Sequence, residues 1–350
     1  MGSLELTLKT LTPIWTGGVD ATADRLHATG IIGSLRWWYE LIVRGLGGSA
    51  CDPSEPTCIY DPNTKSGICD VCRVFGATGW SRRFRLTVEE QTSRPTPNRE
   101  LFTDGSRFKV NGKDRPIWYF KGGLDNDIEL KVIPLSPGFD TNLILGIFKL
   151  IEKRASLAAK SQLGYGFIQI QSSIPAFDYE AFIKSVTENL NRCVSEQTAQ
   201  NQSSYPNLKN FFFAELAVPL KPGQYAVTPL LNLKYDIRKA FRPKPKPTET
   251  NQERDLRHFV CGTTSGELIS SKIFMSQVVG GKMRVWGWLP DQMQVFNVHT
   301  KKREMANYYN RENAMAVIRA EINKFGKLSA WKEFAATDDP KQYLKSLLEG

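Results

Sequence analysis

Hydrophobic and polar residues follow two different periods along the first half of the chain, and these periods predict its strands and helices. Leucine at every second position predicts a strand over residues 4–11. The same alternation predicts three more strands, over residues 82–89, 128–135 and 167–171. Apolar residues spaced by three and four positions predict helices over residues 32–46 and 143–151. The resulting order, β-α-β-β-α-β, is typical of a ferredoxin-like domain.

The second half of the chain repeats this pattern less clearly, after a polar stretch at 191–207. It predicts a strand over 211–220, a short helix over 235–241, a hairpin that turns at Gly280-Gly281, and helices over 305–325 and within 331–348. A fourth strand cannot be placed from the pattern. We therefore predict an α+β fold of tandem ferredoxin-like domains, residues 1–175 and 205–350, in which the second domain is a degraded copy of the first.

Three segments between these elements have no periodic pattern. Residues 51–72 contain four cysteines, and residues 91–126 form a long polar insertion. A connection of that length is more often functional or mobile than simply connective. Residues 242–254 begin with alternating proline and basic residues, which predicts an extended and mobile segment.

The helix over 32–46 carries two adjacent tryptophans that fall on different faces. Trp38 borders the apolar stripe, whereas Trp37 points away from it. Trp37 must therefore be covered by another segment, lie in an interface or stack on a ligand. Arg36, Glu40 and Arg44 follow one another at every fourth position, where opposite charges can pair. An arginine beside an aromatic ring also suits recognition of a phosphate and a base together.

The charge balance narrows the class of partner. The 350 residues carry a net charge of +10, which favours a polyanion. No run of about 18 apolar residues is present, so we expect no membrane span. The first residues lack the basic and apolar regions of a signal peptide, and we expect a cytoplasmic protein.

Four cysteines follow the spacing C-x6-C-x10-C-x2-C, and they are Cys51, Cys58, Cys69 and Cys72. The final pair has the spacing typical of a structural zinc knuckle, and four thiolates complete a closed tetrahedral site without an open position for catalysis. The alternative is a set of reduced, unliganded cysteines, because the first two are irregularly spaced for a zinc ribbon or finger.

A glycine-containing loop precedes the predicted strand at 167–171. Gly164 and Gly166 can adopt positive φ and leave backbone amides free to face a phosphate. Tyr165 between them could present its ring, and Lys160 its charge. The alternative is an ordinary helix C-cap and turn, which would need only one glycine.

Catalytic candidates are scarce. The three histidines are scattered, and only His27 lies near a suspected site. No Ser-His-Asp arrangement, phosphate-binding P-loop or dinucleotide motif is present. We therefore expect a protein that is not an enzyme.

Five segments together resemble the RAMP superfamily of CRISPR RNA-binding proteins: residues 12–18, 33–38, 69–76, 163–166 and 284–290. The glycine loop is a feature of the superfamily, whereas the Arg-Trp-Trp helix and the Cys-x2-Cys-x2-Phe-Gly segment are similar to the family that forms the first subunit of the type III-B (Cmr) effector complex. The resemblance implies tandem ferredoxin-like domains that hold the 3′ end of a guide RNA together with target RNA, beside other Cmr subunits that cleave the target.

The resemblance implies that Arg36 is a phosphate ligand and that Gly164-Tyr165-Gly166 is the loop that faces RNA. We also expect Ser34 and Arg36 to lie in the N-terminal turn of the helix over 32–46, because a helix start attracts phosphate. The complete candidate set for RNA binding is Arg25, Ser34, Arg36, Arg82, Arg83, Lys160, Gly164, Tyr165, Gly166, Lys272 and Arg284.

Two alternatives to an RNA-binding subunit stay open at this point. One is an endoribonuclease of the same superfamily that processes guide precursors, with His27 or Tyr165 in acid-base chemistry. The other is a protein-interaction adaptor whose Trp37 and basic surface contact partner subunits.

Overall fold

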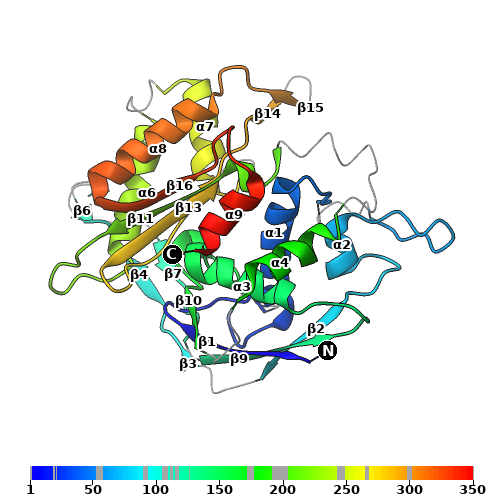
Figure 1. The fold of residues 1–350 in the computed structure, drawn as a ribbon. Coiled ribbons are helices and arrows are strands. Elements are labelled where there is room, and N and C mark those ends of the chain that lie inside the picture. Colours follow the sequence, from blue (N-terminus) through cyan, green and yellow to red (C-terminus); the bar gives the residue numbers. More distant parts are fainter. Residues whose placement is uncertain are drawn as a thin grey trace.

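The computed structural model describes residues 2–18, 20, 22–52, 58–89, 94–104, 109–110, 113–114, 118–125, 127–171, 177–190, 204–242, 249–264, 268–297 and 302–349. The fold is mixed α+β and contains two four-stranded antiparallel sheets (Figure 1). Helices of the first half of the chain and the C-terminal helix lie between the two sheets, and the other long helices of the second half cover the far face of the second sheet.

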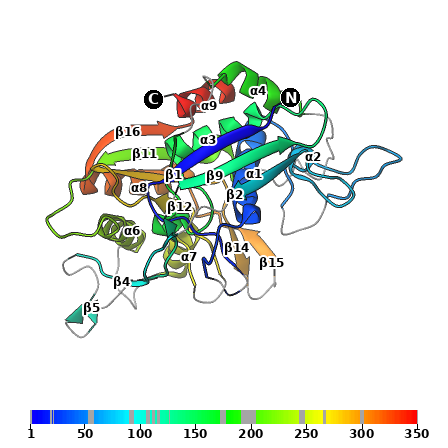
Figure 2. The same ribbon diagram turned by 90° about the horizontal axis from the view of Figure 1, so that it is seen from below.

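The first sheet has the strand order β10-β1-β9-β2, with every pair antiparallel. Its strands and the helices that connect them are β1 (Leu4–Thr10), α1 (Ala28–Gly45), β2 (Phe84–Glu89), β9 (Asp127–Pro134), α3 (Asn142–Arg154) and β10 (Ile168–Ile170). Figure 2 looks onto this sheet, with α1 and α3 behind it. Leu6, Leu8 and Leu130 are buried on the face toward these helices, while the intervening residues are polar. The four predicted strands are therefore confirmed. The sequence alternated clearly because this sheet is covered by helices on one face only.

Helix α1 begins at Ala28, four residues before its predicted start. Thr29 and Gly30 are exposed and add nothing to the apolar stripe, so periodicity could not reveal the first turn. Ser34 is consequently the seventh residue of the helix and Arg36 the ninth. The prediction that Ser34 and Arg36 lie in the N-terminal turn of this helix is therefore wrong.

The second sheet has the strand order β12-β13-β11-β16. Its elements are β11 (Phe211–Ala217), α6 (Thr228–Ala240), α7 (Asn251–Cys261), β12 (Ile273–Met275), β13 (Lys282–Trp288), α8 (Arg311–Phe325) and β16 (Lys327–Glu333). Gly280 and Gly281 both have positive φ at the hairpin turn, as predicted. Strand β16 is the fourth strand that the sequence pattern could not place. Most of its residues are only half-buried, so it shows no clear alternation.

Strand β11 lies inside the second sheet and is buried on both faces. Phe211 and Phe213 belong to the core shared with α1 and α3, while Phe212, Ala214 and Leu216 belong to the core under α6 and α8. A strand buried on both sides reads as a nearly continuous apolar run, which is the sequence of β11.

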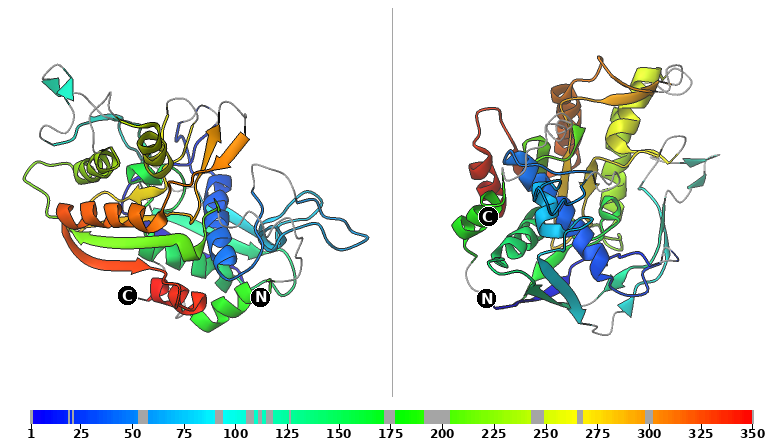
Figure 3. Two further views of the ribbon diagram at one scale, coloured as in Figure 1. Left: turned by 90° about the horizontal axis from the view of Figure 1, so that it is seen from above. Right: turned by 90° about the vertical axis from the view of Figure 1, so that its right-hand side faces the viewer.

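The C-terminal helix α9 (Pro340–Leu348) packs on α3 (Figure 3). Arg154 of α3 donates from Nε to the backbone carbonyl of Leu347 at 2.7 Å, at the end of α9 where a cation stabilises the helix dipole. Arg284 of β13 donates to the carbonyl of Glu152 at 2.7 Å. Both arginines therefore join the two halves of the chain.

The polar insertion packs on the second half. Within its described residues it forms short antiparallel pairs, β3 (Arg94–Pro95) with β8 (Leu124–Asp125), β4 (Arg99–Leu101) with β7 (Trp118–Phe120), and β5 (Lys109–Val110) with β6 (Lys113–Asp114). The N–H of Asp104 donates to Oδ1 of Asn232 in α6 at 2.9 Å, and Gln224 donates to Oδ2 of Asp104 at 2.6 Å. Leu101 is buried in the core of the second half.

The predicted mobile segment at 242–254 is too long. Residues 251–254 form the first turn of α7, and Thr250 and Glu253 form a capping box at the N-terminus of this helix. Residues 243–248 lie outside the described residues.

The remaining elements are short. They are α2 (Asp70–Phe75), η1 (Ser161–Leu163), α4 (Tyr179–Thr187), η3 (Leu208–Asn210), β14 (Gln294–Asn297) and β15 (Lys302–Met305). Among the described residues, no helix combines the length and the apolar character that crossing a membrane requires.

We expect Trp286→Ala to destabilise the whole fold. Trp286 is 1% exposed and packs edge-on against Phe167 of the first half, with ring centroids 5.5 Å apart. Loss of a buried aromatic side chain costs about 3–5 kcal/mol of unfolding free energy. Urea unfolding followed by circular dichroism measures it. The control is Phe296→Ala, because Phe296 is 50% exposed; similar losses in the two variants would contradict the shared core.

Candidate metal centre and nucleic-acid interface

The four cysteine sulfurs meet in one cluster. The Sγ atoms of Cys51, Cys58, Cys69 and Cys72 all lie within 4.8 Å of one another, and those of Cys51 and Cys72 are 3.5 Å apart. Thiolates that each lie about 2.3 Å from a tetrahedral zinc ion are about 3.8 Å apart. The donor set and its spacing therefore fit a closed four-thiolate metal site.

Backbone N–H groups point at the sulfurs. The N–H of Cys69 donates to Sγ of Cys58 at 3.3 Å, and the N–H groups of Cys51 and Cys72 donate to Sγ of Cys69 at 3.4 Å. Hydrogen bonds to a charged acceptor favour its charged form, so these donors favour the thiolate that a metal requires.

Arg36 faces this cluster. Its NH2 atom lies 3.3 Å from Sγ of Cys72 and 3.4 Å from Sγ of Cys51, and its Nε donates to Oε1 of Glu40 at 2.8 Å. Burial alone would lower the pKa of Arg36, but Cys72 and Glu40 raise it overall. Our expectation that Arg36 faces an open RNA groove at the helix start is therefore corrected.

Glu40 lies between two arginines of the same helix. Its Oε2 is 3.6 Å from NH2 of Arg44, and its Oε1 accepts from Arg36, which confirms the predicted pairing. Glu40 is 4% exposed, and burial raises its pKa. Arg44 also donates to the carbonyl of Pro206 at 3.1 Å, which ties α1 to the start of the second half.

The glycine loop is buried between the two halves. Gly164 and Gly166 have φ of +77° and +79°, as predicted. A Cβ at Gly166 would lie 1.9 Å from the carbonyl oxygen of Leu157, and one at Gly164 would lie 2.8 Å from Leu230 of the second half. Tyr165 is 0% exposed, and its hydroxyl donates to the carbonyl of Lys121. Tyr165 therefore does not present its ring to a ligand, contrary to our prediction.

Two other motif segments, residues 12–18 and 33–38, meet the residues that precede this loop. The N–H of Ala158 donates to Oγ of Ser34 at 3.1 Å, and the N–H of Ala159 donates to the carbonyl of Trp15 at 3.1 Å. Nζ of Lys160 lies 3.7 Å from the centroid of a Trp15 ring, a cation–π contact. Burial lowers the pKa of Lys160 to about 8, and Lys121 adds to the effect.

These contacts create a surface that we name the Lys160 strip. Thr16 links its parts, because its hydroxyl donates to the carbonyl of Arg25 and its Cγ2 lies against Gly30. Lys160 is half-buried and the other members are exposed. The strip consists of Arg25, Thr29, Gly30, Gly33, Ala159 and Lys160.

Four other candidate RNA ligands have intramolecular partners. Nε of Arg82 donates to the carbonyl of Phe84 at 2.8 Å, and Nε of Arg83 donates to Oγ of Ser136 at 2.9 Å. Arg284 donates to Glu152, as described above.

Lys272 is 8% exposed and donates to the carbonyl of Phe259 at 2.9 Å. This buried position corrects the prediction that Lys272 faces RNA. Sequence shows the charge of Lys272 but not its burial, so it could not separate this lysine from the exposed Arg25.

His27 and Trp37 have defined surroundings. His27 is the N-cap residue of α1, and its Nε2 lies 3.1 Å from Oδ1 of Asp24. This hydrogen bond lowers the pKa of Asp24. Trp37 is half-buried and packs edge-on against Trp38, with centroids 4.7 Å apart. Trp15 and Asp24 were not among the predicted site residues.

Residues 7–169 match the model of the RAMP superfamily. This part of the chain, a little under half of its length, is therefore similar to that superfamily. No curated protein matches it.

Solved structures of CRISPR proteins are similar to the chain along most of its length. Cmr1 from Pyrococcus furiosus in the apo form has a TM-score of 0.44 at 13% identity, covering 92% of this chain and 97% of that one. A chain of the type III-B Cmr-beta bound to cognate target RNA and AMPPnP has a TM-score of 0.47 at 10% identity, covering 92% and 99%. Another, from Cmr-beta bound to cognate target RNA, has a TM-score of 0.43 at 12% identity, covering 91% and 99%.

We expect Gly166→Ala to destabilise the protein far more than Gly138→Ala. The two glycines have nearly the same φ, +79° and +76°, but nothing lies within 4 Å of a Cβ at Gly138. The left-handed backbone costs alanine about 1–2 kcal/mol at either position. Gly166→Ala adds a clash with the backbone of Leu157. Thermal unfolding of both variants measures the difference, and equal melting temperatures would contradict the close packing of the loop.

Proposed function

We propose that this protein is an RNA-binding subunit of a type III-B CRISPR (Cmr) effector complex, where it holds the 3′ end of the guide RNA together with target RNA for antiviral defence. Other Cmr subunits of the RAMP superfamily are its partners. The observation that carries the proposal is the convergence of residues 12–18, 33–38 and 158–166 at the Lys160 strip. All three segments lie within the residues that match the RAMP superfamily model.

The chemistry of the strip suits an RNA backbone. Gly30 and Gly33 leave the first turns of α1 without side chains on an exposed face, so a phosphate can approach the backbone closely. Arg25 and Lys160 add positive charge to the same strip. Contacts of this kind recognise backbone and shape more than base sequence.

The connectivity of both sheets supports tandem ferredoxin-like domains. In each sheet the first strand lies between the third and the fourth: β1 between β9 and β10, and β11 between β13 and β16. Each half thus follows the β-α-β-β-α-β arrangement, with two helices in the first crossover of the second half.

We further propose that the protein does not cleave RNA by itself. The hydroxyl of Tyr165 donates to a backbone carbonyl inside the fold, so it is not presented to a substrate. His27 pairs with Asp24 at the start of α1 beside the strip. It is the residue to test for the endoribonuclease alternative.

We expect the double variant Arg25→Gln with Lys160→Gln to bind RNA more weakly and with a smaller salt dependence. Each lost phosphate contact on a single strand reduces the slope of log affinity against log salt by about 0.7, so we expect a slope about 1.4 shallower. Fluorescence anisotropy with labelled single-stranded RNA across a sodium chloride series measures it. The matched control is Lys324→Gln with Lys341→Gln, two exposed residues of α8 and α9 that lower the net charge equally.

Identical slopes in the two double variants would reject the strip as the RNA surface. The same incubations test the alternatives. RNA should be recovered intact, and cleavage that disappears in His27→Ala would favour the endoribonuclease. In an assembled complex, crosslinks from strip residues to protein alone would favour the adaptor.

We propose that the cysteine cluster holds one structural zinc ion. The ion would close residues 51–72 around a common centre, since the short helix α2, which begins at Asp70, is the one helix or strand among the described residues of this segment. Arg36 would neutralise part of the charge of two thiolates, and Glu40 would hold its guanidinium in place.

We expect about one zinc ion per chain in the reduced protein, by metal analysis after gel filtration. Cys72→Ser should lose the zinc and lower the melting temperature, since metal binding contributes directly to folding. Cys261→Ser is the matched control, because Cys261 lies outside the cluster. Metal-free protein purified under reducing conditions, with a melting temperature that added zinc does not change, would show that the cysteines are unliganded.

A further inference from the structure

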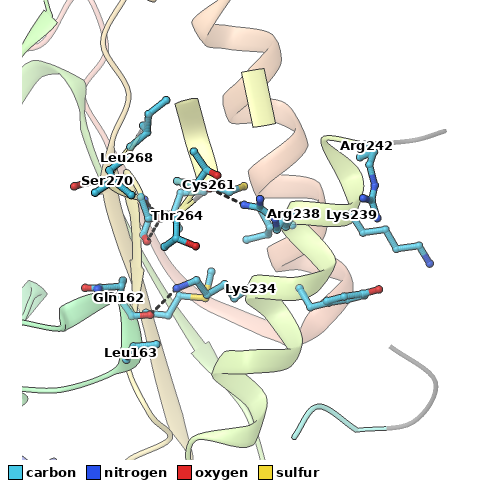
Figure 4. A pocket seen from close by; sticks show the side chains of 18 residues that line it. Gln162, Leu163, Lys234, Arg238, Lys239, Arg242, Cys261, Thr264, Leu268 and Ser270 are labelled. Carbon is cyan, nitrogen blue, oxygen red and sulfur yellow. Dashed lines mark hydrogen bonds between the residues drawn. The ribbon is translucent and has the colours of Figure 1, made fainter. Parts of the chain in front are cut away.

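A second basic site lies in the second half of the chain. A cavity of about 740 Å³ opens between α6, residues 261–264 and 268–275, and Gln162 with Leu163 (Figure 4). Eighteen described residues line it, and four of them are cationic while none is acidic. A cavity of this size is typical of small-ligand sites.

Two of the cations, Lys234 and Arg238, lie one turn apart on one face of α6. Arg242 follows two residues beyond the end of this helix. Figure 4 shows Lys234 and Arg238 reaching from α6 toward the opposite wall. Nζ of Lys234 donates to the carbonyl of Gln162 at 3.0 Å, and NH1 of Arg238 donates to the carbonyl of Gly262 at 2.7 Å. Both of these acceptors are neutral backbone carbonyls, and they orient the two side chains across the cavity.

The electrostatic surroundings favour an anion in the cavity. The charge of Glu249 favours the charged form of Arg238. Both carboxylate oxygens of Glu249, however, accept hydrogen bonds from Arg257, at 2.7 and 2.9 Å. Burial lowers the pKa of Lys234 to about 8, and repulsion from Arg238 adds to this. An anion bound between these side chains would offset both effects.

The rest of the lining is apolar at the wall and polar at the rim. Ile273 and Met275 are 4% and 2% exposed and form a wall together with Leu163. Thr264 and Ser270 are exposed and carry hydroxyl groups at the rim. Cations beside an apolar wall match a ligand that has a phosphate at one end and a flat ring at the other.

We propose that this cavity binds one nucleotide unit, with its phosphate on Arg238 and Lys234 and its base against Leu163, Ile273 and Met275. An RNA strand or a free nucleotide could supply this unit. The structure favours RNA, because residues 160–163 connect the two sites: Lys160 belongs to the strip, and Gln162 and Leu163 line the cavity. The choice of RNA as the source rests on the proposed function, whereas the chemistry of the cavity does not.

The test compares two substitutions in the cavity with matched controls outside it. Arg238→Gln removes the central charge, and Thr264→Glu places a carboxylate among the cations without touching α6. Lys324→Gln and Gln342→Glu make the same charge changes at exposed positions of α8 and α9. Affinity for labelled oligouridylate is measured by fluorescence anisotropy, and affinity for uridine and adenosine monophosphate by calorimetry. Melting temperatures identify any variant that fails to fold.

We expect both cavity variants to lose about tenfold in affinity, the effect of losing one charge-assisted hydrogen bond, while the controls keep wild-type affinity. Loss for oligouridylate alone identifies a strand, and loss for the monophosphates as well identifies a free nucleotide. Wild-type affinity for both probes in Thr264→Glu would overturn the proposal. If the strip variants lose RNA binding in that case, the proposed function stands without the cavity. If the protein binds monophosphates but no RNA, the cavity stands and the proposed function falls.

Discussion

The burial of the second sheet on both faces is the constraint on which the rest of this structure depends. Phe211 and Phe213 on one face of β11 pack into the core of the first half, and Trp38 of α1 meets Phe211 edge-on with centroids 5.8 Å apart. A face so rich in aromatic rings cannot be left in water without a large loss of stability. The helices α1, α3 and α9 cover it, and this fixes the position of one half of the chain against the other.

The glycine loop lies where the two halves meet, and its backbone reflects that position. Ala158, Lys160, Gly164 and Gly166 all have positive φ within nine residues, and two of them are not glycine. Backbone of this kind is costly and persists only where the surroundings determine it. Here Ser34 holds the N–H of Ala158, and Leu230 and Gln277 leave no room for a side chain at Gly164. The junction between the halves therefore sets the position of Lys160 in the strip.

Sequence predicted the elements that have one buried face and missed those whose burial depends on distant segments. Alternation located the strands of the first sheet, but β16 is half-buried along its length and left no pattern. Cysteine spacing indicated the cluster that the structure brings together, since the residues lie close along the chain. The partner of Arg36 was misjudged, because thiolates and phosphates attract a guanidinium alike and only the fold decides between them. The buried positions of Tyr165 and Lys272 depend on contacts that no local pattern records.

The net charge of +10 overstates the charge that a polyanion can reach. Arg44 and Arg154 are 3% and 6% exposed and hold backbone carbonyls of the second half, and Arg36 is bound to sulfur and Glu40. These arginines have a structural role, because one guanidinium group can donate hydrogen bonds to several backbone carbonyls where the two halves meet. Other cations lie along the Lys160 strip and along the face of α6 that borders the cavity, where Lys160 contacts Trp15 and where Lys234 and Arg238 donate to neutral carbonyls. A polyanion drawn to the protein would meet these two sites, and residues 160–163 join them.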